Sequence, residues 1–264
     1  MPSVSSIAVG ALVAGSAASK ARHGMNESIA RLSTGMRSMY GGDAAGQSVA
    51  NTLQARSMSW AVAARNAEDG ISAAQTAESA LLEIAALAQR LRELGIQADN
   101  AALLADASDE AALDAEAVAV ADAVDAIVAA TTFNGVSLLG TSAVSLNIGV
   151  TDAGGTVALK TSDAIAAITA ITQAGASDGS ADATLTDVAI SLGNVAAGIA
   201  ALKGRQAVAY SASANLAAAA ARIEDTDFAS ETANLTKNSV LNQSAMAMVA
   251  QANQAQSAVL AVLN

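Results

Sequence analysis

The sequence contains no cysteine, one proline at position 2, and aromatic residues at only 2% of its 264 positions. Without cysteine the chain forms neither disulfides nor thiolate metal sites. With no proline after position 2, the rest of the sequence lacks the strongest helix breaker. Because 53% of the residues are nonetheless hydrophobic, alanine supplies much of the apolar content, and alanine is the best helix former. The composition therefore predicts long helices that pack closely in thin layers.

Positive charge is also scarce, with 13 Lys and Arg against 24 Asp and Glu and a net charge of -11. This balance argues against binding nucleic acid, which needs cations to neutralise phosphates, and against binding anionic membrane surfaces. No segment reads as a membrane span. The uncharged first nineteen residues lack the basic start of a secretory signal, since Lys20 and Arg22 follow them, so we expect no cleaved signal.

Candidate catalytic and metal-binding groups are few. His23 is the only histidine, and the sequence has no P-loop, no glycine-rich fingerprint after a strand and no histidine-based metal cluster. Eight carboxylates from Asp99 to Asp125 follow the exterior of a helix and lack the pattern of a calcium-binding loop. Asp225 and Asp227 interrupt a helical pattern, where carboxylates more often cap helices than catalyse. We therefore expect no enzyme activity, no metal and no other cofactor.

Hydrophobic periodicity is the strongest signal in the sequence. Between residues 188 and 223, residues that are apolar or small, apart from the polar Gln206, recur in alternating steps of four and three, a heptad seam typical of a helix packed along its length and weakened by Gln206 and Ser213. Similar rows of apolar residues at helical spacing predict a helix over about 43–97 and another through 113–127. We expect residues 99–108 to reverse the chain between them. Residues 173–184, rich in Gly, Ser, Ala and Asp, are predicted to be a loop.

One short region departs from the helical period. Apolar residues alternate with small or polar ones at 144–150 and 157–159, on either side of a glycine-containing turn, which predicts a β-hairpin near residues 143–160. The expected fold class is therefore mainly α: long helices in a coiled-coil-like bundle with one small β-hairpin, and with the N- and C-terminal helices paired. Two domains are expected, a terminal inner-core domain of residues 1–42 and 224–264 and a helical bundle of residues 43–223.

The two chain ends are almost free of charge. After Glu231 the only charged residue is Lys237, and the polar positions are Asn and Gln. Because a solvated helix normally carries charges on its outer face, uncharged amphipathic ends indicate surfaces that become buried against copies of the chain. The alternative is an ordinary terminal helix docked on its own domain. The residues predicted to mediate self-assembly are Leu241, Ala245, Met248, Ala252, Ala255, Val259, Val262 and Leu263.

Several strings resemble, in order, those of one family. They are RLSTGMR at 31–37, GDAAG at 42–46, RNAEDGIS at 65–72, QRLREL at 89–94, TFNG at 132–135, RIEDTDF at 222–228 and ETANLTK at 231–237. Over about 28–139 and 192–264 the chain resembles bacterial flagellin. The resemblance implies a secreted structural subunit that self-assembles into the extracellular flagellar filament for motility. Only about 140–187 separates the matching parts, so we expect a short flagellin without an outer domain.

The resemblance also implies partners besides other flagellin copies: an export chaperone, and the cap and hook-junction proteins. In some family members a vertebrate innate immune receptor reads a surface matched here by Arg90, Leu94 and, two positions beyond the usual spacing, Glu116. Packing between subunits is the competing role for these three residues. Two alternatives to a filament subunit remain, a hook–filament junction protein and another secreted coiled-coil binding protein; the strings at 132–135 and 222–228 favour flagellin over the junction protein.

Overall fold

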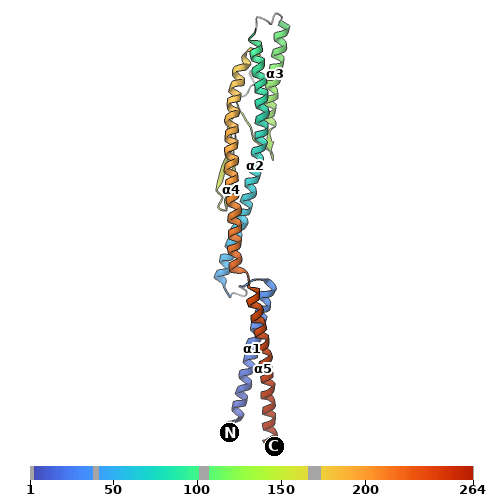
Figure 1. Cartoon of the computed structure of the whole chain (residues 1–264), viewed down its shortest axis with the longest axis vertical. Helices are drawn as coiled ribbons and strands as arrows, with labels where there is room; N and C mark the ends of the chain where they lie inside the picture. Colours follow the sequence, from blue (N-terminus) through green and yellow to red (C-terminus); the bar gives the residue numbers. More distant parts are fainter. Residues whose placement is uncertain (1–2, 38–41, 101–106, 166–173, 264) are drawn as a thin grey trace. The chain divides into compact units, whose positions relative to one another are not determined.

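The computed structural model describes residues 3–37, 42–100, 107–165 and 174–263 (Figure 1). Within these residues the helices are α1 (Ser3–Thr34), α2 (Ala44–Ala98), α3 (Ala107–Ala130), the 3-10 turn η1 (Ala174–Ala176), α4 (Ser177–Glu224) and α5 (Phe228–Leu263). The strands are β1 (Thr132–Phe133), β2 (Val136–Ser137), β3 (Val144–Gly149) and β4 (Thr156–Ser162). The predicted fold class is confirmed: the chain is mainly α, its terminal helices pair, and a hairpin of β3 and β4 lies where it was expected.

Contacts divide the chain into two compact units. The terminal unit comprises residues 1–55 and 216–264, and the central unit comprises residues 56–215. Helices α2 and α4 contribute residues to both units, whereas α1 and α5 lie side by side in the terminal unit (Figure 1). The domain boundaries predicted at residues 42 and 224 stay a prediction.

The α1–α5 pair is closely packed because the residues between the helices are small. Helix α1 buries Ala14, Ala18 and Ala21, which recur at helical spacing on one face. A Cβ on Gly24 would lie 2.7 Å from the side-chain nitrogen of Asn238, so the missing side chain permits this approach of α5. Alanine and glycine bury little apolar area each, so this interface alone contributes little hydrophobic stabilisation.

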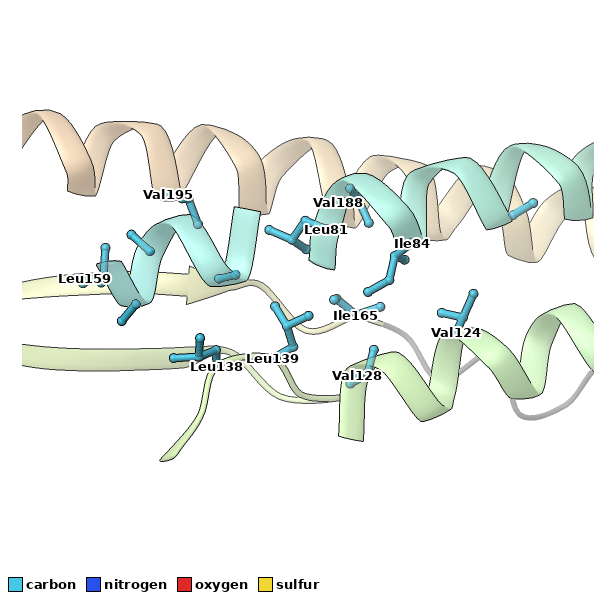
Figure 2. Close-up of a cluster of buried hydrophobic side chains, with 14 of the residues drawn as sticks. Leu81, Ile84, Val124, Val128, Leu138, Leu139, Leu159, Ile165, Val188 and Val195 are labelled. Carbon is cyan, nitrogen blue, oxygen red and sulfur yellow. The ribbon is translucent and has the colours of Figure 1, made fainter. Parts of the chain in front are cut away.

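The core of the central unit is formed by α2, α3, α4 and the β3–β4 hairpin (Figure 2). Its largest fully buried side chains are Leu81, Ile84, Leu91, Leu94, Leu138, Leu139, Leu159, Ile165, Leu202, Val124, Val150 and Val188. Full burial of each contributes about 1.5–3 kcal/mol. The hairpin lies close to the helices because Gly70 faces Ile148 and Gly198 faces Leu159, where a Cβ would collide with the leucine side chain. The core therefore combines a heptad seam between helices with glycines on α2 and α4 that let the β3–β4 hairpin pack closely against them.

The loop predicted over residues 173–184 was wrong, because η1 begins at Ala174 and α4 at Ser177. The seam of α4 extends back through Ala181 and Thr184, which are 0% and 1% exposed, to Ser177, which is fully buried. The Ser177 hydroxyl donates to the carbonyl oxygens of Leu91 and Ala174. Small and hydroxyl-bearing residues thus continue the heptad period, which a search for apolar residues overlooks.

Helix α4 also has the length and mean hydropathy that a membrane-crossing helix needs. Among the described residues it is the only helix that does. The core helix of a soluble protein satisfies the same criterion, and α4 buries Val188, Val195 and Leu202 in the central core. Length and composition are therefore a weak indication of a membrane span here.

Candidate assembly surface on the terminal helices

An apolar groove of about 540 Å³ runs between α1 and α5 in the terminal unit. It is lined by Val9, Gly10, Val13, Ala14, Ala17, Leu241, Ser244, Ala245 and Met248. None of these residues carries a charge, and small residues on its floor keep the groove open. Val13 is 61% exposed, Leu241 49% and Met248 65%, so large apolar side chains at its edges face solvent.

The exposed apolar surface continues beyond the groove. On α1, Leu12 is 75% exposed, and on α5 Val240 and Met246 are 55% and 52% exposed. The part of α1 from Ser3 to Ser19 contains no charged residue, so nothing ionic interrupts this surface. An exposed apolar groove of this kind marks an interaction surface more often than a solvated one.

The residues predicted for self-assembly occupy different places around this groove. Ala245 is 8% exposed on its floor, whereas Leu241 and Met248 stand at its edge. Ala252 and Ala255 are half-buried further along α5. The helix continues through Val259, Val262 and Leu263, whose side chains lie outside the described part of the structure. The structure thus brings three of the eight predicted residues into one groove with α1.

Polar groups are present where α1 meets α5 near the start of α5. The Glu231 side chain is only 9% exposed, and its Oε1 lies 3.5 Å from Nη1 of Arg31. That oxygen accepts no hydrogen bond from the residues that the structure describes, and neither does the buried Oδ1 of Asn242. Sequence reasoning missed the Arg31–Glu231 pair, since the two residues are 200 positions apart and no local pattern joins them.

A second feature missed from the sequence ties the connection after α1 to the end of α4. The backbone N–H of Arg37 donates to the carbonyl oxygen of Glu224 at 2.7 Å, and its Nε donates to that of Ile223 at 3.1 Å. Nη2 of Arg37 also lies 2.7 Å from Oδ2 of Asp43. Asp43 caps α2, because its Oδ1 accepts from the Gly46 N–H. That backbone hydrogen bond and, second, the Arg37 side chain hold the pKa of Asp43 below its ordinary value.

The residues matched to an immune-receptor surface lie in the central unit. Nη2 of Arg90 is 2.6 Å from Oε1 of Glu116, and its Nη1 is 3.1 Å from Oε2 of Glu93. The hydrogen bond to Glu116 is the main cause that raises the pKa of Arg90. Arg90 and Glu116 are both about half exposed, whereas Leu94 is fully buried in the core. The structure therefore pairs two of these residues on the surface and places the third inside.

The described residues contain many carboxylates, one histidine and no cysteine. Among them, no group of three or more His, Asp or Glu side chains is placed to hold a metal ion. The carboxylates of α3 instead serve structural roles where their contacts are known: Asp114 accepts a hydrogen bond from the backbone N–H of Ala174 at 2.6 Å, and Glu116 pairs with Arg90.

The paired terminal helices and their uncharged apolar groove define a helical structural subunit of the self-assembling class. Residues 6–144 match the model of the bacterial flagellin N-terminal helical region, and residues 162–263 match that of the bacterial flagellin C-terminal helical region. The chain belongs to the bacterial flagellin family. It is a structural subunit of the flagellar filament, which serves motility.

The chain is similar to several known flagellins. The chain is 33% identical over 279 residues to a flagellin of Bacillus subtilis (strain 168), covering 90% of this chain and 92% of that protein. It is 33% identical over 249 residues to a flagellin of Halalkalibacterium halodurans, and the match covers 90% of this chain and 91% of that protein. Flagellin A of Vibrio cholerae is 42% identical over 132 residues, 50% of this chain and 34% of that one. A crystal structure of Bacillus cereus flagellin is 27% identical, covers 58% of this chain and 88% of that one, and gives a TM-score of 0.39.

Proposed function

We propose that this filament subunit polymerises by burying the groove between α1 and α5, together with the apolar surface around it, against neighbouring copies. The observation that carries the proposal is the groove itself, with Val13, Leu241 and Met248 exposed and uncharged at its edges. The part of the chain that the structure describes leaves about half or more of each of these three side chains exposed. A neighbouring copy offers the same uncharged surface.

The energetics favour such a contact. Full burial of one Val, Leu or Met side chain contributes about 1.5–3 kcal/mol, so completing the burial of several half-exposed ones yields several kcal/mol per copy. Burying a charge would offset this gain, but the groove contains none. Repeated at every subunit, the contact drives growth of a polymer.

Two further roles follow from this proposal. The chain acts as a structural protein without catalysis, outside the cell, after export. The exposed residues of α1 and α5 are the surface that an export chaperone, the cap and the hook-junction proteins contact, since these partners meet the subunit before it is buried in the polymer. An innate immune receptor is a further proposed partner, at the exposed Arg90–Glu116 pair. A reporter-cell assay in which purified monomer elicits no response would refute the proposed binding to the immune receptor.

The test uses Met248→Asp, because Met248 is 65% exposed and the change leaves the monomer's core intact. A carboxylate that must enter an apolar contact costs several kcal/mol if it stays charged. We expect a monomer with unchanged melting temperature that forms no filaments in electron micrographs, whereas Met248→Leu polymerises normally. Normal filaments from Met248→Asp would refute the buried-groove proposal.

The hook–filament junction alternative makes a different prediction in the same experiment. A filament subunit extends preformed filament seeds continuously as more protein is added. A junction protein binds the seed ends and adds no length. Measuring filament length against added wild-type protein therefore separates the two functions, and a secreted coiled-coil binding protein would neither extend nor cap the seeds.

A further inference from the structure

A second pocket, of about 450 Å³, lies in the central unit between α2, the β1–β2 hairpin and β3. It is lined by Asp69, Gly70, Ala73, Phe133, Asn134, Val136, Leu138, Leu146 and Ile148. The β1–β2 turn has positive φ at both central residues, 48° at Asn134 and 79° at Gly135, which folds Phe133 back opposite Val136. Val136 remains 49% exposed, so the residues that the structure describes do not fill this pocket.

Asp69 is the only charged residue that lines the pocket. It is exposed, and no ion pair within 4.0 Å joins it to any residue in the described ranges. An apolar pocket with one unpaired carboxylate at its rim suits a large apolar side chain that has a cation beside it. This combination specifies the chemistry of the occupant.

Two aromatic side chains in the described part of the chain are at least half exposed, Tyr210 at 51% and Phe228 at 57%. Phe228 follows Asp227 and precedes Glu231 by one helical turn, so it would bring like charge towards Asp69. Tyr210 instead lies seven residues after Lys203, on the same face of α4. Lys203 is exposed and makes no ion pair with a described residue. Of these two aromatic residues, charge therefore favours Tyr210.

We propose that Tyr210 of one copy inserts into the pocket of a neighbouring copy, where Lys203 pairs with Asp69 of that neighbour. The inference rests on the chain's assembly with copies of itself and adds a contact between central units. None of the residues that line the pocket belongs to α4, and Tyr210 lies about 120° around α4 from Gly198, which faces the β3–β4 hairpin, so Tyr210 does not fill the pocket of its own copy. A side chain and a pocket on different surfaces of one subunit make a head-to-tail contact, the kind that builds open helical polymers. Exposed tyrosines are also common anchors of protein interfaces.

Cross-linking tests the contact in filaments whose terminal helices are unchanged. The chain has no cysteine, so introduced thiols have no background. Val136→Cys puts a thiol on the pocket, and Ala207→Cys puts one between Lys203 and Tyr210 on the same row. Oxidised filaments of the double variant should give a ladder of multimers on a denaturing gel, and mixed filaments of the two single variants should give dimers only. The control pairs Val136→Cys with Ala201→Cys, on the other side of α4, and should stay monomeric.

A ladder from the control pair with none from the Ala207 pair overturns the proposal, as does the absence of cross-links from both pairs in intact filaments. The absence of cross-links counts against this contact even if the terminal groove drives assembly, because electron microscopy shows that filaments are present before oxidation. A loss of filaments in Met248→Asp concerns the terminal groove alone. The two proposals therefore fail separately.

A charge exchange tests the ionic part independently. Asp69→Lys and Lys203→Glu should each raise the critical concentration for polymerisation about tenfold, and the combined variant should return to within about threefold of wild type. Tyr210→Ala should raise it by about tenfold or more, Tyr210→Phe should change it little, and Val208→Ala, an exposed control on another side of α4, should leave it unchanged. A combined variant no better than its parents would contradict the Lys203–Asp69 pair.

Discussion

Arg37 donates from its Nε to the carbonyl oxygen of Ile223 at 3.1 Å, across 186 residues of sequence. The same arginine donates its backbone N–H to Glu224, and the adjacent Met36 forms a β-bridge with Asp225. Thr226 donates its backbone N–H to Gly35 at 2.8 Å. These hydrogen bonds join the connection that follows α1 to the connection that precedes α5. They therefore hold the C-terminal end of α1 close to the N-terminal end of α5.

Replacing Arg37 should therefore loosen both connections at once. Arg37→Ala removes the Nε bond to Ile223 and the ion pair with Asp43, at a cost of about 1 kcal/mol or less because the side chain is half exposed. Hydrogen exchange of the backbone amides at residues 37 and 226 should accelerate together. Arg37→Lys keeps the charge but lacks the planar donor group, and should behave more like Ala than like wild type. Faster exchange at only one of the two amides would contradict the coupling.

The lowered pKa of Asp43 makes the cap of α2 sensitive to acid. The cap needs the ionised carboxylate, which accepts from the Gly46 N–H and pairs with Arg37. Since the pKa is lower in the folded chain than its ordinary 3.8, the cap stabilises the fold fully above that value, and the stabilisation is lost as the pH falls through the lowered pKa. The free energies of unfolding of wild type and Asp43→Asn, measured between pH 2 and 7, should differ at neutral pH and converge in acid. Parallel curves would show that Asp43 does not titrate in this way.

Gly95 and Gly193 provide a matched pair of glycine-to-alanine changes. A Cβ on Gly95 would lie 2.8 Å from the backbone nitrogen of Asp178, which is part of α4 and cannot rotate away. Gly95→Ala should thus separate α2 from the start of α4 and destabilise the fold by about 1–3 kcal/mol. A Cβ on Gly193 meets nothing within 4 Å, so Gly193→Ala should stabilise α4 by about 0.5–1 kcal/mol. Thermal unfolding measures both effects, and equal shifts in melting temperature for the two variants would contradict the close packing of α2 against α4.

The sequence predicted the long helices and the β3–β4 hairpin because their periodicities are local and strong. It failed at 177–184, where Ser177 and Thr184 hold core positions that apolar residues usually occupy. It placed Leu94 on a receptor surface by resemblance, whereas the structure buries that side chain. The β1–β2 hairpin was missed because each strand has two residues, although the Asn134-Gly135 turn is a known hairpin signal.

The groove that we propose as the assembly surface could be predicted only in part. The absence of charge at both ends is visible in the sequence. The pairing of α1 with α5, however, decides that Leu241 and Met248 stand at the edge of a groove while Ala245 lies on its floor. That outcome depends on which residues of α1 lie opposite, and no pattern within α5 contains this information.

Limited proteolysis compares the ends before and after assembly. Free monomer should lose both terminal segments to a nonspecific protease and retain a fragment of roughly residues 42–222, because local openings expose helices with few buried apolar contacts. In filaments the same segments should be protected. Equal cleavage of monomer and filament would indicate that the ends stay accessible after assembly.

The most direct measurement of the central claim is electron cryo-microscopy of filaments grown from the wild-type chain. The account predicts that α1 and α5 of every copy are enclosed by neighbouring copies, with Val13, Leu241 and Met248 out of contact with solvent. A filament in which the α1–α5 groove faces the outside, with subunits joined only through residues 56–215, would contradict it.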